Sequence, residues 1–163
     1  MIALIADTHM PKGSRRLPDR CVELLAAADA VIHAGDFFAG SVLSELERLN
    51  PVVHAVHGNV DEPALRERLP PRLEIEVGIH RVGLIHDAGP ARGRLARLRA
   101  SFPDAGAVVF GHSHLPLHEH DRDGFQIFNP GSPTERRRAP RRSMGILRTD
   151  RGELAFEHVW LGG

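Results

Sequence analysis

Short apolar runs recur along this chain and are separated by polar or amphipathic segments. Several runs are rich in Val, Ile and Ala and are too short for helices, which is typical of strands buried on both faces. We predict such strands at residues 2–6, 30–35, 52–58 and 107–111. Residues 72–79 alternate between apolar and polar side chains and residues 80–86 follow at once, so we predict an antiparallel pair there.

Segments with apolar residues at helical spacing lie between the strands. We predict helices at residues 19–28, 41–49, 62–69 and 91–102. Ser41 is expected to cap the second of these helices, and Asn50-Pro51 to end it. The last helix carries arginines on one face, which we interpret as a solvated surface.

The second half of the chain is richer in hairpins, with turns predicted at Asp123-Gly124 and Arg151-Gly152. A β-α-β-α-β first half followed by hairpins indicates an α/β fold with a mixed sheet, or with two sheets packed between helices. Because no linker divides the sequence, we expect a single domain over residues 1–163.

The composition excludes several classes of partner. Lys and Arg together number 21, as do Asp and Glu, so net charge gives no reason to expect nucleic acid or an anionic membrane. Cys21 is the only cysteine and the amino terminus is a poor signal peptide. No run approaches the roughly 18 apolar residues of a membrane span, so we expect a cytoplasmic protein. The arginine-rich segment 135–142 is interpreted as a solvated loop, with steering of an anionic substrate as the alternative.

Five of the apolar strands are followed at once by residues that can bind a metal. They are Asp7, His9, Asp36, Asn59, His86, His112 and His114. In open α/β sheets, residues just past the carboxyl ends of neighbouring strands meet in one crevice, where ligands bind. Gly35, Gly58 and Gly111 precede three of these positions and permit the sharp turn that this requires.

Each of these residues has an ordinary interpretation when it is taken alone. The aspartates can cap or turn the chain, the asparagine can sit in a turn, and a His-x-His pair recurs by chance. Together they form a set that chance does not readily place after five strands. Three Asp or Asn side chains and four imidazoles are too many for one zinc ion and too poor in carboxylates for calcium, and they suit two transition metals that share a ligand. A hydrolytic or redox enzyme with a single zinc ion stays open as an alternative.

The ordered set resembles the five motifs of the calcineurin-like metallophosphoesterases. The elements GNVD (58–61) and NPGS (129–132) look like those of its small prokaryotic branch. This resemblance implies an αββα sandwich of two mixed sheets, with two divalent metal ions at one end. It implies that Asp7, His9 and His114 bind the first ion, that Asn59, His86 and His112 bind the second, and that Asp36 bridges them.

The resemblance also implies an activity, the hydrolysis of phosphodiester bonds in small substrates by a water or hydroxide that bridges the metals. Manganese is the first expectation, with nickel, iron, cobalt and zinc as alternatives. Small relatives often self-associate, which leaves a homo-oligomer open. A retromer-type scaffold, which has the same fold and binds protein partners, is the alternative function, and the complete ligand set argues against it.

Two departures from the family pattern bear on catalysis. Many members have a histidine after the motif asparagine that is thought to protonate the leaving group, and Val60 stands there in this chain. His57 is the nearby candidate for that role, although it can equally be a packed strand residue. Asp87 either orients His86 or caps the following loop. We expect structural or surface roles for the other histidines, His33, His54, His80, His118, His120 and His158.

Overall fold

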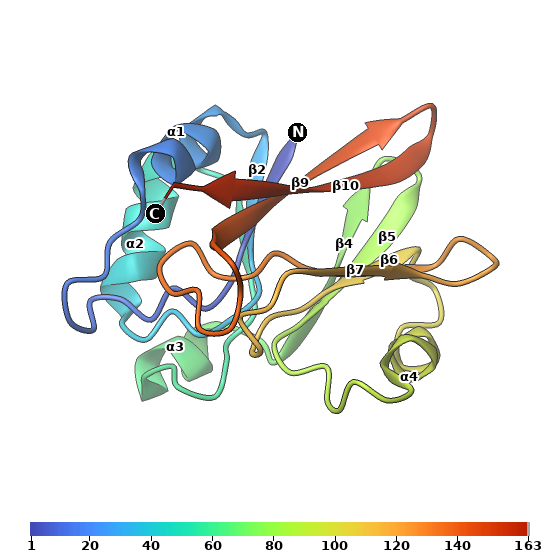
Figure 1. Ribbon diagram of the computed structural model, residues 1–163, viewed down its shortest axis with the longest axis horizontal. Coiled ribbons are helices and arrows are strands. Elements are labelled where there is room, and N and C mark those ends of the chain that lie inside the picture. Colours follow the sequence, from blue (N-terminus) through green and yellow to red (C-terminus); the bar gives the residue numbers. More distant parts are fainter. Residues whose placement is uncertain (163) are drawn as a thin grey trace.

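A computed structural model describes residues 1–162, in which two five-stranded mixed sheets pack face to face (Figure 1). The first sheet has the order β10-β9-β1-β2-β3. Its strands are β1 (Ile2–Ile5), β2 (Ala30–His33), β3 (Val53–Ala55), β9 (Arg142–Asp150) and β10 (Glu153–Leu161). The strands β1, β2 and β3 run parallel, whereas β9 and β10 pair antiparallel.

The second sheet has the order β4-β5-β6-β8-β7. Its strands are β4 (Arg72–Val77), β5 (His80–Ile85), β6 (Ala107–Val109), β7 (Leu117–His120) and β8 (Gln126–Asn129). Parallel pairs again occupy the centre, β5 with β6 and β6 with β8, and antiparallel pairs form both margins.

The helices cover the outer faces of the two sheets (Figure 1). On the first sheet lie α1 (Asp19–Ala27), α2 (Gly40–Leu49) and α3 (Pro63–Arg68), and on the second lies α4 (Arg94–Ser101). Strand β1 shows how the layers form: Ala3 and Ile5 pack toward the helices, while Leu4 packs between the sheets with Phe128 and Leu147. Because both faces of β1 are covered, its run of apolar residues is continuous. The expected αββα sandwich is confirmed.

The start of α2 differs from the prediction. The helix begins at Gly40, Ala39 is its N-cap, and Ser41 lies inside the first turn without capping it. The amide of Gly40 instead donates to Glu62 Oε1 at 2.7 Å. A contact between residues so distant in sequence satisfies the exposed amide, and a local capping rule cannot foresee it.

The carboxyl ends of β1, β2, β3, β5 and β6 meet at one edge of the sandwich. The amide of Asp7 donates to Gly35 O at 3.0 Å, and the amide of Gly111 donates to His86 O at 2.9 Å. These bonds join the loops that leave neighbouring strands, so their polar side chains share one region. Among the described residues, no helix is both long and apolar enough to cross a membrane.

Candidate metal centre

Six of the seven predicted site residues form two groups of three at this edge. Within each group, one ligand atom of every residue lies within 4.8 Å of the others. The first group is Asp7, His9 and His114, and the second is Asp36, His86 and His112. Each group takes residues from the ends of both sheets, so folding of the whole sandwich is needed to assemble either one.

Asn59, the seventh predicted residue, lies beside the second group. Its side-chain oxygen Oδ1 is 3.1 Å from His86 Nε2 and 3.1 Å from His112 Nδ1. An amide oxygen between two imidazole nitrogens adds a fourth donor atom to this group.

Asp36 belongs to the second group and also faces the first. Its oxygen Oδ2 is 3.4 Å from His9 Nε2 in the first group and 3.1 Å from His86 Nε2 in the second. The other oxygen, Oδ1, accepts a hydrogen bond from the amide of Val60 at 3.0 Å, which fixes the carboxylate. One carboxylate oxygen therefore faces donor atoms from both groups.

The backbone is unusual at these residues. The φ angle is positive at five of them: Asp7 (56°), His9 (45°), Asp36 (62°), His112 (71°) and His114 (59°). Residues other than glycine rarely adopt this region, and such strain gathers at functional sites. It lets the chain turn sharply after a strand and direct a side chain back toward the sheet edge.

Two glycines make room for the donor side chains. Gly35 has a φ of +91°, and a Cβ atom there would lie 2.7 Å from His86 Nδ1. A Cβ atom on Gly58 would overlap the carboxylate of Asp36. The glycines that the sequence places before Asp36 and Asn59 are therefore required by close packing of the site.

Buried polar atoms in the first group have no hydrogen-bond partner among the described residues. They are Asp7 Oδ2, His9 Nε2 and both ring nitrogens of His114. Such atoms are costly to bury unpaired, by about 1–3 kcal/mol each. Carboxylate oxygens and imidazole nitrogens at these spacings fit a divalent transition metal, which would satisfy them.

Charge interactions between the carboxylates and imidazoles of the site shift their pKa values. Burial raises the pKa of Asp36, but contacts with His86 and His9 outweigh burial, and the pKa is lowered overall. Burial lowers the pKa of His9, but the carboxylates of Asp36 and Asp7 outweigh it and raise this pKa to about 9. Without a metal, protons on the imidazoles therefore balance the carboxylates, so metal binding releases protons.

His114 behaves in the opposite way. Burial, followed by the positive charge of Arg137, lowers the pKa of His114 to about 3. Its ring is therefore neutral at ordinary pH, which is the form that binds a metal. Burial also raises the pKa of Asp7.

Asp61 supports the site, a role that its local sequence pattern does not predict. Its buried carboxylate accepts hydrogen bonds from the amides of Asp36 (3.1 Å), Phe38 (2.9 Å) and Gly58 (2.6 Å). It thereby ties the loop after β2 to the loop after β3. The only sequence signal was its place in GNVD.

The NPGS element supports the site from the other side. Asn129 Nδ2 donates to Gly111 O at 2.9 Å, just before His112. Ser132 Oγ donates to Asp7 O at 2.8 Å. These side chains hold the backbone of candidate ligands without facing the donor atoms themselves.

Two other predicted roles are resolved. Asp87 Oδ1 accepts from the amide of Gly89 at 2.8 Å, so it caps the loop. The partner of His86 Nδ1 is instead Ala34 O, at 2.8 Å. His33 is fully buried, bonded to Thr8 Oγ1 at 3.1 Å and stacked on Phe37, which is the structural role expected of it.

Two pockets of about 330 Å³ border the second group. One lies beside Asn59 and His86, and His57 forms part of its wall. The other lies beside His112, where Arg137 forms part of the wall. Both hollows therefore border residues of this group.

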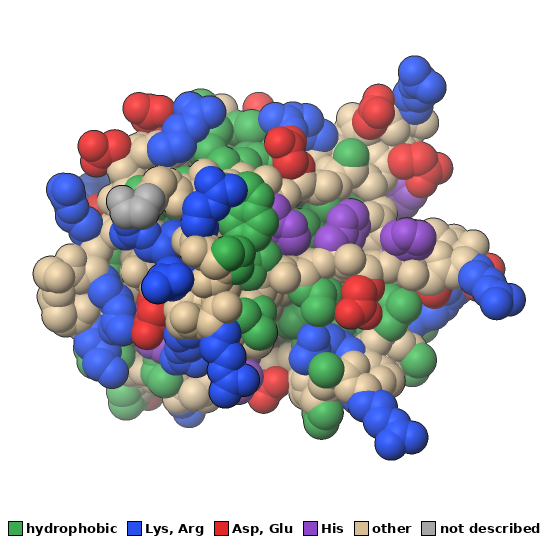
Figure 2. Space-filling view, in the orientation of Figure 1, with side chains coloured by type: hydrophobic (Ala, Val, Ile, Leu, Met, Phe, Trp, Pro, Cys, Tyr) green, Lys and Arg blue, Asp and Glu red, His purple; other side chains and the backbone are tan. Residues whose placement is uncertain are grey.

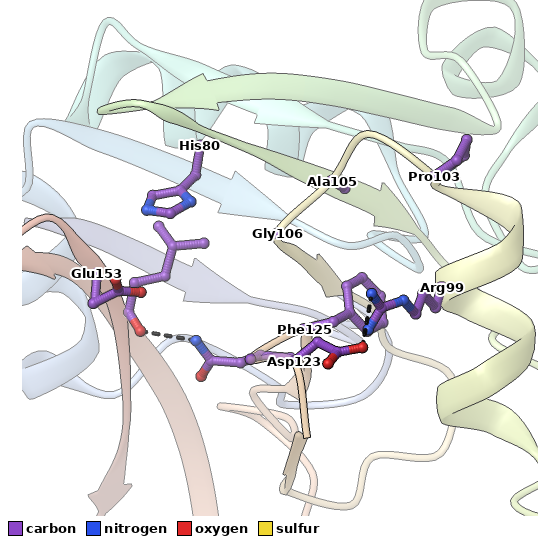
Figure 3. A pocket seen from close by; sticks show the side chains of 11 residues that line it. His80, Arg99, Pro103, Ala105, Gly106, Asp123, Phe125 and Glu153 are labelled. Carbon is purple, nitrogen blue, oxygen red and sulfur yellow. Dashed lines mark hydrogen bonds and ion pairs between the residues drawn. The ribbon is translucent and has the colours of Figure 1, made fainter. Parts of the chain in front are cut away.

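A further hollow of about 210 Å³ lies at the opposite ends of the strands, where β5, β6 and β8 begin (Figure 3). Two of its polar side chains are paired: Arg99 contacts Asp123 at 3.3 Å, and the side chain of Gln126 donates to Leu154 O at 2.9 Å. It holds no group of metal-binding residues among the described residues and lies away from the predicted site.

Known proteins resemble this chain over most of its length. The family described as "Calcineurin-like phosphoesterase superfamily domain" matches residues 1–152. A protein of Methanothermobacter thermautotrophicus described as a probable metallophosphoesterase is 35% identical, covering 99% of this chain and 93% of its own. A Thermotoga maritima protein solved by NMR is 31% identical with a TM-score of 0.77, covering 98% of each chain. Vps29 of Entamoeba histolytica, crystallised with zinc, has a TM-score of 0.77 over 98% of each chain at 23% identity, which shows a shared fold.

Proposed function

We propose that this chain, which belongs to the calcineurin-like phosphoesterase superfamily, hydrolyses phosphodiester bonds in small substrates with the help of two divalent metal ions. The observation that carries this proposal is the pair of donor groups that Asp36 joins, with two pockets beside the second group. The phosphate of a diester carries two organic substituents, its two arms, and each of the two pockets could hold one of them.

The chain's own residues have distinct roles in this proposal. Asp7, His9 and His114 hold the first ion, while Asn59, His86 and His112 hold the second. Asp36 contributes to both and sets their spacing. When bound, such ions polarise a phosphate ester and lower the pKa of water, and we expect manganese first, with nickel, iron, cobalt and zinc as alternatives.

Protonation of the leaving group is assigned to the pocket beside Asn59. Val60 has no proton to donate, so its contribution is limited to the amide that holds Asp36. His57 lines this pocket, with Nδ1 3.3 Å from Gly58 O, and is the candidate donor. If His57 is a weak donor, esters with acidic leaving groups react best.

The alternative function is a retromer-type scaffold that binds protein partners. The likeness to Vps29 is below 25% identity and speaks for the fold alone. Four buried donor atoms at the candidate centre have no partner among the described residues, and a metal centre that acts in hydrolysis would satisfy them. We therefore favour the enzyme.

We place the activity in the cytoplasm. Cys21 is a free, buried cysteine, and burial raises the pKa of its thiol to about 12, so it is a packed and unreactive residue. A chain without a disulfide has no need of an oxidising compartment. A homo-oligomer is compatible with the proposal and is not required by it.

The test combines metal analysis with a matched pair of chromogenic substrates. Purified protein should hold about two transition-metal ions per chain and should hydrolyse bis(p-nitrophenyl) phosphate faster than p-nitrophenyl phosphate. Asp36→Ala should abolish turnover of both, which excludes a contaminating phosphatase. Metal bound without hydrolysis across a broad panel of esters would overturn the proposal, and a stoichiometry near one would favour the single-zinc alternative.

A further inference from the structure

The arginine-rich segment 135–142 belongs to the loop from β8 to the first residue of β9, and it folds over the candidate metal centre rather than away from it. In Figure 1 this loop is orange, and Figure 2 shows Lys and Arg side chains gathered over the same region. Arg137 and Arg138 line one of the two pockets, together with Ser113, Leu115 and the candidate ligand His112.

Hydrogen bonds fix the base of this loop to the loop of candidate metal ligands. Thr134 Oγ1 donates to Thr8 O at 2.8 Å, next to the bond from Ser132 to Asp7. Ala139 is buried, and its amide donates to Arg136 O at 2.7 Å, which closes a turn. Arg137 has a φ of 46°, which is strained for a residue other than glycine. The loop is therefore a built structure, unlike a solvated tail.

The positive charge in this pocket is largely uncompensated. Among residues 1–162, no acidic side chain pairs with Arg138. Arg137 meets Glu135 only through Nε, at 3.9 Å, and Arg15 approaches the same carboxylate more closely, at 3.2 Å. The terminal nitrogens of Arg137 and Arg138 are thus available to an anion, and planar guanidinium groups bind phosphate oxygens in pairs.

The pocket beside His57 differs in charge. Arg66 in its wall already donates to Asp61 O at 3.1 Å and to the carbonyl of Asn59. Asp87 adds a negative charge to the same wall. A substrate with one charged and one less charged arm would therefore bind in a single orientation.

We propose that the pocket formed by Arg137, Arg138 and His112 binds a second phosphate of the substrate, so that the preferred substrates are phosphodiesters with a phosphomonoester on one arm. The inference rests on the proposed function, because it assigns the arms of a diester. The scissile phosphate lies at the metals and the remote phosphate contacts the arginines, while the leaving group occupies the pocket near His57.

The kinetic test uses two substrates that differ by one phosphate. Thymidine 5′-(p-nitrophenyl phosphate) is compared with its 3′-phosphorylated form, and the selectivity is the ratio of their kcat/KM values. We expect the 3′-phosphate to raise kcat/KM by about tenfold, mostly through KM, since two charge-assisted contacts are gained. The double variant Arg137→Asn with Arg138→Ala should bring this ratio close to one, and asparagine tolerates the positive φ at the first position.

Arg136→Ala is the matched control, since Arg136 belongs to the same loop but does not line the pocket. It removes one positive charge from the loop, where the double variant removes two, and should keep the selectivity of the unmodified protein. A ratio near one in the unmodified protein, or an equal loss in Arg136→Ala, would overturn the inference. The second result would mean that the loop acts only through its overall charge.

A binding measurement keeps this inference separate from the proposed activity. Calorimetry on metal-free protein compares thymidine 3′,5′-bisphosphate with thymidine 5′-monophosphate. The bisphosphate should bind more tightly by several-fold, and the double variant should remove this difference while Arg136→Ala keeps it. If no diester is hydrolysed but the difference is seen, the proposed function fails and the phosphate pocket stands. Equal binding of both nucleotides would overturn the pocket.

Discussion

The two donor groups of this protein are built from similar residues but stand in different surroundings. All three residues of the first group are buried, and four of its polar atoms have no partner among the described residues. The second group includes the exposed His112, its atoms contact Asn59, and two pockets open beside it. Under the proposed function, this difference predicts a division of labour, in which the first group would retain an ion and the second would meet the substrate.

The largest expected effects come from two single substitutions, each of which removes one imidazole from one of the groups. His114→Ala should abolish tight binding of one ion and lower kcat/KM for a chromogenic diester by about 1,000-fold or more, because a buried donor set loses one of its three ligands. His112→Ala should weaken the other ion by about 100-fold while the first ion stays bound. Metal analysis after dialysis against a graded series of chelator concentrations measures both.

The unmodified protein provides the reference for this experiment. Chelator should remove its ions in two steps, the accessible ion first. Each variant should lack a different one of these two steps. If both variants lack the same step, or if the unmodified protein releases its ions in a single step, the division between a buried and an open group is contradicted.

Asp61→Asn tests how the second group is held. An amide cannot accept all three of the hydrogen bonds that Asp61 receives, so we expect a loss of about 2–3 kcal/mol in the free energy of unfolding. Because Asp61 fixes the loops after β2 and β3, the substitution should also weaken binding of the ion at the second group more than binding of the ion at the first. Urea denaturation and metal titration measure the two effects.

Asp87→Asn is the control for that change. Asp87 lies beside the same pocket, is exposed, and accepts only the amide of Gly89. Its substitution should cost less than about 1 kcal/mol. Equal losses in the two variants would show that Asp61 has no special role.

The smallest effect concerns His33, which is buried and contacts Thr8, between two residues of the first group. Burial lowers the pKa of His33 well below the ordinary 6.5, so folded His33 stays neutral where the unfolded chain binds a proton. The unfolded state then binds more protons below pH 6.5, and this residue makes stability fall as the pH falls, by up to about 1.4 kcal/mol per pH unit.

The measurement compares unfolding free energies of metal-free protein between pH 7 and pH 5. The difference in slope between the unmodified protein and His33→Gln isolates His33 from the site histidines. His120→Gln, on the exposed strand β7, controls for the loss of a histidine. An unchanged slope in His33→Gln would show that His33 takes up a proton in the folded state.

The sequence was informative wherever a local pattern determines structure. Apolar runs predict the strands, and the rule that strand ends converge predicts that Asp7, Asp36 and His86 lie together. The pattern could not show that Asp36 faces both groups, because that depends on the positive φ at this residue and on its contact with Val60.

Contacts between residues far apart in sequence account for the rest. Glu62 rather than Ser41 satisfies the start of α2, and Ala34 rather than Asp87 contacts His86. The position of Arg137 over the site depends on how Thr134 is tied to the loop after β1. In each case a side chain has an ordinary local role available, and only packing of the two sheets decides the outcome.

The residues with positive φ angles at the candidate centre have a consequence for protein engineering. Each of them costs about 1 kcal/mol or more relative to glycine or asparagine, so the centre is a place where stability has been given up. A laboratory selection for heat resistance alone, with no demand for hydrolysis, should therefore accumulate substitutions at Asp7, His9 and His114 early. Selection for both properties should leave these positions untouched and improve the helices and loops instead.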